Sequence, residues 1–270
     1  MEITQTVKHW LETGFVDIFL GYRLVDGHHI PHGYTRENLS EVDQMVGSET
    51  RYSLEQLATR ISSRHPQATI GMLARDCSKR AVNVLVVWNQ LDKDRIKTID
   101  VNCCPSPLNK HADCSYLDSE QPGSFKIRAG IAKNAKISGA EENDQHERLA
   151  RWMYEFQKCI KCYGCRNICP VCFCKECSLE HPDLVHSGRL PPDVPIFHLV
   201  RATHMAGRCI DCGLCEQACP MDIPLRLLYR KVNQIVSDVF DYDTGTSAEQ
   251  SPFSVLGEKV TLTPKPLNAS

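Results

Sequence analysis

Two stretches decide the fold of this chain: CIKCYGCRNICP at residues 159–170 and CIDCGLCEQACP at residues 209–220. Both read C-x2-C-x2-C-x3-C-P, so the same cysteine spacing occurs twice. A tight loop can supply three thiolates at two-residue intervals, and a [4Fe–4S] cube needs four thiolates at the corners of a tetrahedron. The repeat therefore predicts two [4Fe–4S] clusters.

The fourth cysteine of each run is expected to serve the other cluster. It precedes a proline, Pro170 or Pro220, and points away from the loop that carries the first three cysteines. Exchange of the fourth ligands gives two predicted sets. Cluster 1 takes Cys159, Cys162, Cys165 and Cys219, and cluster 2 takes Cys209, Cys212, Cys215 and Cys169.

A pair of structural zinc sites is the alternative for these thiols. A zinc site with four thiolates pairs two C-x2-C knuckles and needs neither a third evenly spaced cysteine nor a C-x3-C-P ending. One C-x2-C alone would leave zinc, a redox dithiol and an iron–sulfur cluster open. Two complete runs favour the clusters.

The composition indicates a folded chain without a strong overall charge. It has 270 residues, 42% of them hydrophobic, and a formal net charge of −2, so no global field points to nucleic acid. Fifteen cysteines would suggest disulfides in a secreted protein, but their spacing indicates metal. The N-terminal MEITQTVKHW has no secretory pattern, and no apolar run approaches the roughly 18 residues of a membrane span. We expect a cytoplasmic protein in which thiolates stay reduced.

The expected fold class is α+β. The chain is expected to begin with an α/β domain over residues 1–118. Alternating or continuous apolar stretches predict the strands, and helical periodicity predicts the helices. The predicted strands cover 16–22, 68–74 and 96–101, and the predicted helices cover 38–46, 53–63 and 76–90. Ser53 is the expected N-cap of the second helix. The strand–helix–strand unit that ends this domain should be a right-handed parallel crossover.

The rest of the chain is expected to hold a linker, a cluster domain and a tail. Residues 119–144 are polar with scattered glycines and predict a linker. A dicluster domain of the bacterial-ferredoxin type follows at 145–236, opened by a helix over 145–156 and closed by a helix over 225–236. Residues 237–270, with three early aspartates and then Ser, Gly and Pro, predict an extended C-terminal tail.

Longer stretches carry a family resemblance. CIKCYGCRNICPVCFCKEC at 159–177 and FHLVRATHMAGRCIDCGLCEQACPMDIPL at 197–225 resemble the iron–sulfur beta subunits of formate dehydrogenases. They also resemble the related beta subunits of deazaflavin-coenzyme hydrogenases, which are found with heterodisulfide-reductase-type complexes. ATIGMLARDCSKRAV at 68–82 is more faintly similar to the same family. The chain departs from this family in length: longer relatives carry a further region associated with a flavin, and we expect a shortened form that lacks it. Flavin binding is doubtful, since no G-x-G-x-x-G fingerprint is present either.

Cysteines outside the two runs could form an additional metal site. Cys172, Cys174 and Cys177 follow the first run closely and could be three ligands of a third cluster or of zinc. Their fourth ligand would be His181 or a cysteine of the N-terminal domain. The cysteines there are Cys77, Cys103, Cys104 and Cys114. Cys77 and Cys104 follow neighbouring parallel strands and could face one another. The alternative is that all of these thiols are small buried packing residues.

The histidines are expected to have two different surroundings. Those between the two runs should pack near the clusters and donate hydrogen bonds to sulfur, which tunes the reduction potential. They are His181, His186, His198 and His204. His28, His29 and His32 lie in a stretch with Gly and Pro and are expected to be solvated turn residues.

The sequence shows no Ser-His-Asp arrangement, phosphate loop or acid–base pair that would predict catalysis by the chain itself. We expect an electron-transfer subunit that passes electrons through two [4Fe–4S] clusters to an acceptor. Its catalytic partner would be of the formate dehydrogenase, hydrogenase or heterodisulfide-reductase type. Expected partners are thus redox subunits of a larger complex, with neither nucleic acid nor a transmembrane segment.

Two other functions remain open. One is a flavin- or deazaflavin-dependent oxidoreductase whose N-terminal domain is the cofactor site. The other is a structural or sensing module whose clusters report redox state, although no DNA-binding pattern supports it.

Overall fold

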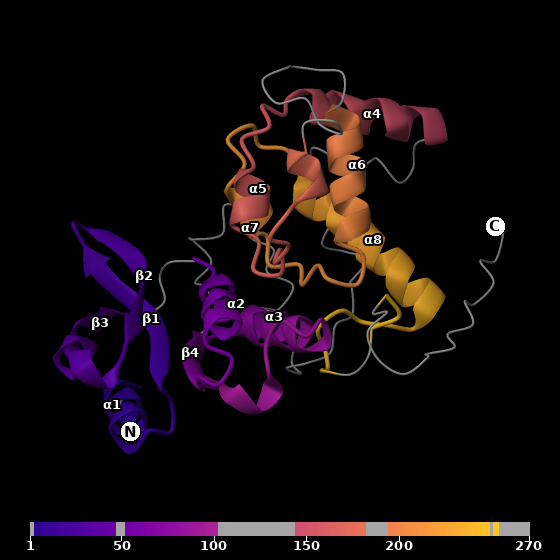
Figure 1. Cartoon of the computed structure of the whole chain (residues 1–270). Coiled ribbons are helices and arrows are strands. Elements are labelled where there is room, and N and C mark those ends of the chain that lie inside the picture. Colours follow the sequence, from indigo (N-terminus) through magenta and orange to yellow (C-terminus); the bar gives the residue numbers. More distant parts are fainter. Residues whose placement is uncertain (1–2, 47–51, 102–143, 182–193, 249–250, 254–270) are drawn as a thin grey trace. The chain divides into compact units, whose positions relative to one another are not determined.

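A computed structural model describes residues 3–46, 52–101, 144–181, 194–248 and 251–253 (Figure 1). The predicted linker lies outside these ranges except for Asp144, and so do Cys103, Cys104, Cys114 and His186. The chain divides into two compact units. Unit 1 combines the described part of residues 1–109 with the short segments 169–173 and 245–250, and unit 2 holds the other described residues. Helices and strands are mixed, as the sequence predicts.

Unit 1 is built on a five-stranded sheet in the order β2-β1-β4-β5, with β3 paired to β1. The strands are β1 (Ile18–Val25), β2 (His28–Tyr34), β3 (Met45–Val46), β4 (Ile70–Ala74) and β5 (Ile96–Asp100). β1, β4 and β5 run parallel, whereas β2 and β3 run antiparallel to β1. The strands predicted at 68–74 and 96–101 correspond to β4 and β5, and their predicted parallel orientation is confirmed.

The sheet is held by apolar side chains and by one close approach between strands. All residues of β4 are buried, as expected for a continuous apolar run in a parallel sheet. Gly71 lies opposite Phe19 in the pairing of β4 with β1. A Cβ at Gly71 would meet the Phe19 ring at 2.5 Å, so glycine is needed there for the ring to lie across the neighbouring strand.

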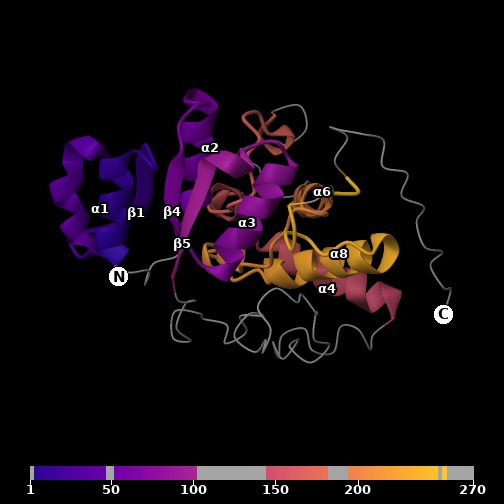
Figure 2. The same ribbon diagram turned by 90° about the horizontal axis from the view of Figure 1, so that it is seen from below.

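Helices cover both faces of the sheet of unit 1. They are α1 (Ile3–Thr13), α2 (Leu54–Arg64) and α3 (Asp76–Val87). The hydroxyl of Ser53 accepts a hydrogen bond from the Gln56 N–H at 3.3 Å, which confirms the predicted N-cap of α2. Figure 2 shows α1 on one side of the strands and α2 and α3 on the other.

Two predictions for unit 1 are wrong. The helix expected at 38–46 is instead the 3-10 helix η1 (Arg36–Gln44) followed by β3, and Asn38 breaks the helical geometry with φ −119° and ψ 36°. The histidines at 28, 29 and 32 belong to strand β2 rather than to a solvated turn. The turn lies just before them, where Asp26 and Gly27 have φ of 49° and 77°.

Unit 2 is helical. Its elements are α4 (Gln145–Gln157), α5 (Gly164–Asn167), η4 (Ser178–Glu180), α6 (Val194–His204), α7 (Leu214–Gln217) and α8 (Leu225–Phe240). The carboxylate of Asp144 accepts a hydrogen bond from the Glu147 N–H at 2.9 Å and begins α4. α6 packs against both α4 and α8. Phe156, Phe197 and Tyr229 are buried in this packing.

The C-terminal segment departs from the extended tail expected from residue 237. Helix α8 continues through Phe240, where Asp241 ends it in a left-handed conformation with φ 55°. After the helix, Thr244 and Ser251 are buried. The tail beyond residue 253 lies outside the described residues.

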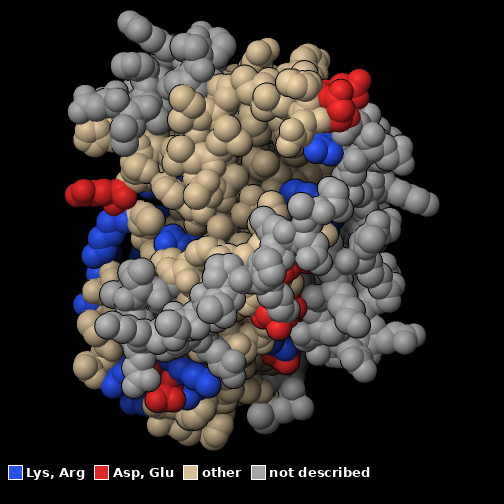
Figure 3. All heavy atoms as spheres, turned by 90° about the vertical axis from the view of Figure 1, so that its right-hand side faces the viewer, with Lys and Arg blue, Asp and Glu red and all other residues tan. Residues whose placement is uncertain are grey.

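Surface charge is mixed on the face drawn in Figure 3. Lys and Arg side chains there lie beside Asp and Glu side chains, and uncharged side chains cover most of the described surface. This distribution agrees with the small net charge of −2. No helix within the described ranges is long and apolar enough to cross a membrane.

Candidate metal centre

The two cysteine runs share one local backbone. In the first run, Lys161 and Tyr163 have positive φ of 52° and 57°. The matching residues of the second run, Asp211 and Gly213, have φ of 56° and 75°. After these turns each run enters a single helical turn, α5 in the first run and α7 in the second. The two short helices pack against one another (Figure 1). The sequence repeat is therefore a structural repeat.

Each loop directs a backbone N–H to the sulfur of its first cysteine. The Lys161 N–H donates to Cys159 Sγ at 3.3 Å, and the Asp211 N–H donates to Cys209 Sγ at 3.4 Å. Hydrogen bonds of this kind favour a thiolate and hold it in place as a metal ligand. Lys161, Tyr163 and Asp211 adopt the left-handed conformation although none of them is glycine, so these loops are strained.

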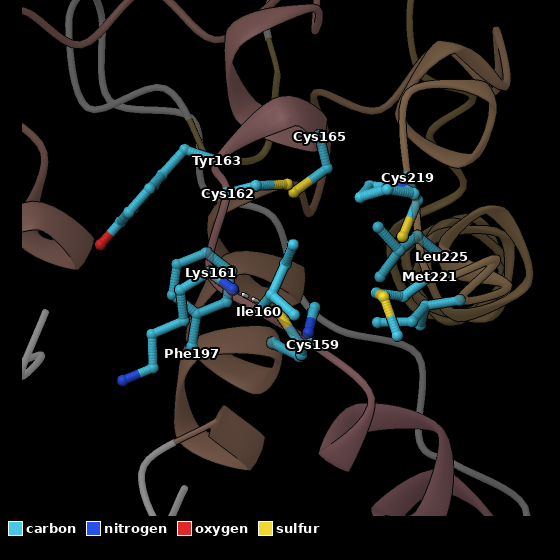
Figure 4. A pocket seen from close by; sticks show the side chains of 13 residues that line it. Cys159, Ile160, Lys161, Cys162, Tyr163, Cys165, Phe197, Cys219, Met221 and Leu225 are labelled. Atoms are coloured by element: carbon cyan, nitrogen blue, oxygen red, sulfur yellow. Dashed lines mark hydrogen bonds between the residues drawn. The ribbon is translucent and has the colours of Figure 1, made fainter. Parts of the chain in front are cut away.

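Four cysteines of unit 2 line one pocket. They are Cys159, Cys162, Cys165 and Cys219, the four that the spacing assigns to cluster 1. Figure 4 shows that Cys219 reaches the pocket from a separate segment of the chain, opposite the loop that carries the other three. Apolar residues, among them Phe197, Ile223 and Leu225, form the rest of the wall. The thiols and the apolar wall fit an iron–sulfur cube, which thiolates bind in surroundings of low polarity.

The surroundings disfavour thiolates unless a cation is bound. Burial raises the pKa of the Cys159 thiol, and the N–H of Lys161 offsets part of that effect. Burial also raises the pKa of Cys165, against the opposing field of the Arg201 guanidinium. Arg201 is itself buried and donates from Nη2 to the Cys165 carbonyl at 2.8 Å. Iron would supply the positive charge that thiolates at the buried Cys159 and Cys165 require.

His198 is a buried polar group in the same wall. Its side chain is 1% exposed, and neither ring nitrogen has a hydrogen-bond partner in the described part of the chain. Burial, with the nearby Arg201 charge, lowers the pKa of His198 to about 4, so the ring is neutral near pH 7. An orphaned N–H beside four thiols is a second feature that fits a sulfur-rich group in this pocket.

The loop of the second run is fixed by a buried ion cluster. The Asp211 carboxylate accepts hydrogen bonds from Arg226 Nε at 2.6 Å and from Arg230 Nε at 2.9 Å. Burial raises the pKa of Asp211, but the two guanidinium groups outweigh burial and leave this pKa below its usual value. Glu216 accepts from the Arg226 N–H at 3.1 Å, at the start of α8. Helix α8 and the loop with Cys209 and Cys212 are thereby joined.

The predicted fourth ligand of cluster 2 lies in the other unit. Cys169 groups with unit 1, where Gln56 Nε2 donates to its carbonyl oxygen at 2.7 Å. The ring of Phe173, in the same short segment, lies 6.2 Å from that of Trp88. Cys209, Cys212 and Cys215 belong to unit 2. The assembly of cluster 2 from these four residues stays a prediction.

The cysteines proposed for an additional site have varied surroundings. The Cys172 N–H donates to the Cys169 carbonyl at 3.2 Å, and the matching turn of the second run joins Asp222 to Cys219 at 3.3 Å. Cys174 is exposed, and Cys177 packs against Leu179 and Phe197. Cys77 lies in the first turn of α3 and is half-buried. Across the described ranges, no three Cys, His, Asp or Glu stand close enough to hold a single metal ion. The additional site stays a prediction.

Comparison with known proteins supports an iron–sulfur assignment. The model of a 4Fe-4S binding domain, Fer4, matches residues 202–224, which include the whole second run. The F420-dependent formate dehydrogenase subunit beta of Methanocaldococcus jannaschii is 41% identical over 150 residues, 50% of this chain and 40% of that protein. The F420-dependent formate dehydrogenase 1 subunit beta of Methanococcus maripaludis is 36% identical over 150 residues, 50% of this chain and 38% of that protein.

The resemblance predicted from the sequence is confirmed. Half of this chain is related to formate dehydrogenase beta subunits, and the match spans 40% and 38% of the length of those two relatives. A weaker similarity extends to the acetyl-CoA decarbonylase/synthase complex subunit alpha 1 of Methanosarcina mazei, 27% identical over 120 residues. It covers 44% of this chain and 13% of that subunit. Together these findings support an iron–sulfur electron-transfer subunit.

Proposed function

We propose that this chain passes electrons through two [4Fe–4S] clusters between a catalytic redox partner and an acceptor. The partner is of the formate dehydrogenase, hydrogenase or heterodisulfide-reductase type, and the complex is cytoplasmic. Cluster 1 uses the three leading thiols of the first run with Cys219, and cluster 2 uses those of the second run with Cys169. In this proposal the N-terminal α/β domain (1–118), the linker (119–144) and the cluster domain (145–236) keep the bounds expected from the sequence.

The observation that carries this proposal is the ring of four thiols around one pocket. Three of them come from one loop, and Cys219 comes from the end of the other run. A structural zinc site with four thiolates pairs two C-x2-C knuckles, whereas this pocket takes three evenly spaced cysteines from one run and a single cysteine from the end of the other. The shared backbone of the two loops extends the argument to a second cluster, because the same φ pattern and the same N–H to Sγ contact recur at Asp211 and Cys209.

Exposed side chains beside the pocket support electron exchange with a partner. Ile160 and Met221 line the pocket and are 49% and 37% exposed. Cys162 is exposed as well. A cluster bound here would lie near the surface, where another redox centre can approach it.

The proposal is tested by iron and sulfide analysis of protein reconstituted without oxygen, together with electron paramagnetic resonance (EPR) of the reduced protein. We expect about eight irons per chain and the signals of two magnetically coupled [4Fe–4S] clusters. About four irons would limit the chain to one cluster. Zinc without inorganic sulfide would overturn the proposal.

The same reconstituted protein also tests the alternative function, through its absorption spectrum, and the additional metal site, through its metal content. A flavin or deazaflavin absorption band above the broad cluster absorption would favour an oxidoreductase with its own organic cofactor. About twelve irons, or eight irons with one zinc, would assign the additional site to Cys172, Cys174 and Cys177 with Cys77 or Cys104. We expect eight irons, with none of these thiols bound to metal.

A further inference from the structure

His198 faces the candidate cluster from helix α6. It lines the same pocket as Cys159, Cys162, Cys165 and Cys219. Its side chain is almost completely shielded from water, and both ring nitrogens lack a hydrogen-bond partner within the described residues. A neutral imidazole has one N–H donor, so the wall of this pocket contains a donor without an acceptor.

Two aromatic rings fix the orientation of His198. Phe156 of α4 stacks on the imidazole, with ring centroids 4.8 Å apart and 17° between the planes. Phe197, the neighbouring residue on α6, meets the imidazole edge-on at 5.2 Å and 86°. Both phenylalanines are 1% exposed. Because a stacked ring keeps its polar edge in its own plane, His198 cannot turn its N–H toward Phe156 or toward bulk water without breaking this packing.

We propose that His198 donates its ring N–H to a sulfur of the cluster held by Cys159, Cys162, Cys165 and Cys219, and that this hydrogen bond raises the reduction potential of cluster 1. The inference rests on the proposed function and assigns a positioning residue to one of its clusters. Reduction adds one electron to the cube and makes its sulfurs more negative. A hydrogen bond to sulfur is therefore stronger in the reduced state and favours reduction.

Arg201 acts on the same cluster in a different way. It lies three residues after His198 on α6 and donates from Nη2 to the carbonyl of Cys165 at 2.8 Å. Its guanidinium carries a full positive charge near the Cys165 thiol, whereas His198 is a neutral donor. Helix α6 thus presents two groups that favour the reduced cluster, one through charge and one through a hydrogen bond.

The decisive variant is His198→Phe, which keeps a ring for the stack on Phe156 and removes the donor. His204→Phe is the matched control, because His204 lies on the same helix and is exposed. The two clusters are titrated separately in the holoprotein by EPR at defined potentials. We expect His198→Phe to lower the equilibrium constant for reduction of cluster 1 about tenfold. For one electron this corresponds to a reduction potential lower by about 59 mV. Cluster 2 and the His204→Phe protein should keep wild-type potentials.

Unchanged potentials in a fully loaded His198→Phe protein would overturn the inference and assign His198 to packing alone. A second measurement covers the case in which this variant does not load iron. In wild-type protein labelled with 15N-histidine, pulsed EPR of reduced cluster 1 should detect a coupled histidine nitrogen, and loaded His198→Gln protein should lose it. Absence of this coupling in the wild type would also overturn the inference. A wild-type protein without any iron–sulfur signal would instead refute the proposed function itself.

Discussion

Gly164 lies directly against the main chain of Ala218: a Cβ added at Gly164 would meet the Ala218 carbonyl oxygen at 3.0 Å and Cys162 Sγ at 3.5 Å. Ala218 immediately precedes Cys219. The start of α5 therefore touches the segment that brings the fourth thiol to the pocket of cluster 1. Glycine at this position allows the two cysteine runs to approach as closely as the pocket requires.

Gly164→Ala should impair cluster 1. The added methyl group meets the Ala218 carbonyl, which cannot rotate away as a side chain can, so either the segment before Cys219 or the loop that carries Gly164 must shift by a few tenths of an ångström. We expect less iron bound per chain after reconstitution and a weaker cluster 1 signal. Gly33→Ala is the control, because the nearest atom to its Cβ, also at 3.0 Å, would be Cδ1 at the movable end of the Ile18 side chain. Equal iron content in both variants would contradict the close-approach argument.

Asp211→Asn should destabilise unit 2 strongly. The carboxylate is buried between Arg226 and Arg230, whose side chains are 8% and 15% exposed. Its removal leaves two largely buried cations without their anion, a change that typically costs about 3 kcal/mol or more. The measurement is the urea midpoint of the iron-loaded protein.

The control for this substitution is Asp100→Asn, which breaks an exposed ion pair. The Asp100 side chain is 68% exposed and lies 2.8 Å from Lys79 Nζ. Surface pairs contribute little, so its urea midpoint should stay near that of wild type. A midpoint for Asp211→Asn that also matched wild type would mean that the Asp211 cluster does not hold the second loop.

Gln56→Ala should speed the loss of iron to a chelator. Gln56 fixes the main chain at Cys169 by a 2.7 Å hydrogen bond, and loss of such a bond costs about 1 kcal/mol. If Cys169 is a cluster 2 ligand, its thiolate will be held less firmly. Gln90→Ala is the matched control, since it removes a similar hydrogen bond of unit 1, from Gln90 Nε2 to the Trp88 carbonyl at 2.9 Å. Identical release rates for the two variants would argue against a role of this contact in cluster retention.

Much of unit 1 could be predicted because local signals agree with the tertiary structure. Ser53 caps α2, and the continuous apolar run before Arg75 forms the fully buried β4. Strand β2 was missed because an edge strand with one neighbour needs few apolar residues, and its histidines looked like turn residues. The Asp26–Gly27 dipeptide, a common two-residue hairpin turn, was the signal that could have found it. Helix α1 was also missed, although Val7 and Leu11 lie one turn apart and are buried.

The candidate site was predictable only where chemistry fixes sequence spacing. A cube with four thiolates constrains the intervals between cysteines, so the set around the pocket could be named in advance. The neighbours of the site follow no such interval. Gln56, Asp211 and His198 act through contacts with residues far away in the sequence or through burial, which a single sequence does not encode locally. Asp211 carried one weak hint, because it replaces Lys161 in an otherwise similar loop.

Iron removal should unfold residues 157–225 before the sheet of unit 1. The loops of the two runs contain single-turn helices and few large apolar side chains, so bound clusters should supply much of their stability. Unit 1 has its own core, which includes Phe19, Met72 and Leu85. Limited proteolysis after anaerobic chelation should cut first within 157–225. Unchanged protease resistance of that segment after complete iron removal would contradict this expectation.

The pairing of Cys219 with the first run is the central claim, and one comparison tests it most directly. EPR spectra and iron contents of reduced Cys162→Ala, Cys215→Ala and Cys219→Ala proteins are recorded under the same anaerobic conditions. Cys162→Ala should leave only cluster 2, and Cys215→Ala should leave only cluster 1. We predict that the spectrum of Cys219→Ala matches that of Cys162→Ala, because both thiols line one pocket. A Cys219→Ala spectrum that matched Cys215→Ala would show that each run binds its own cluster and would contradict the account.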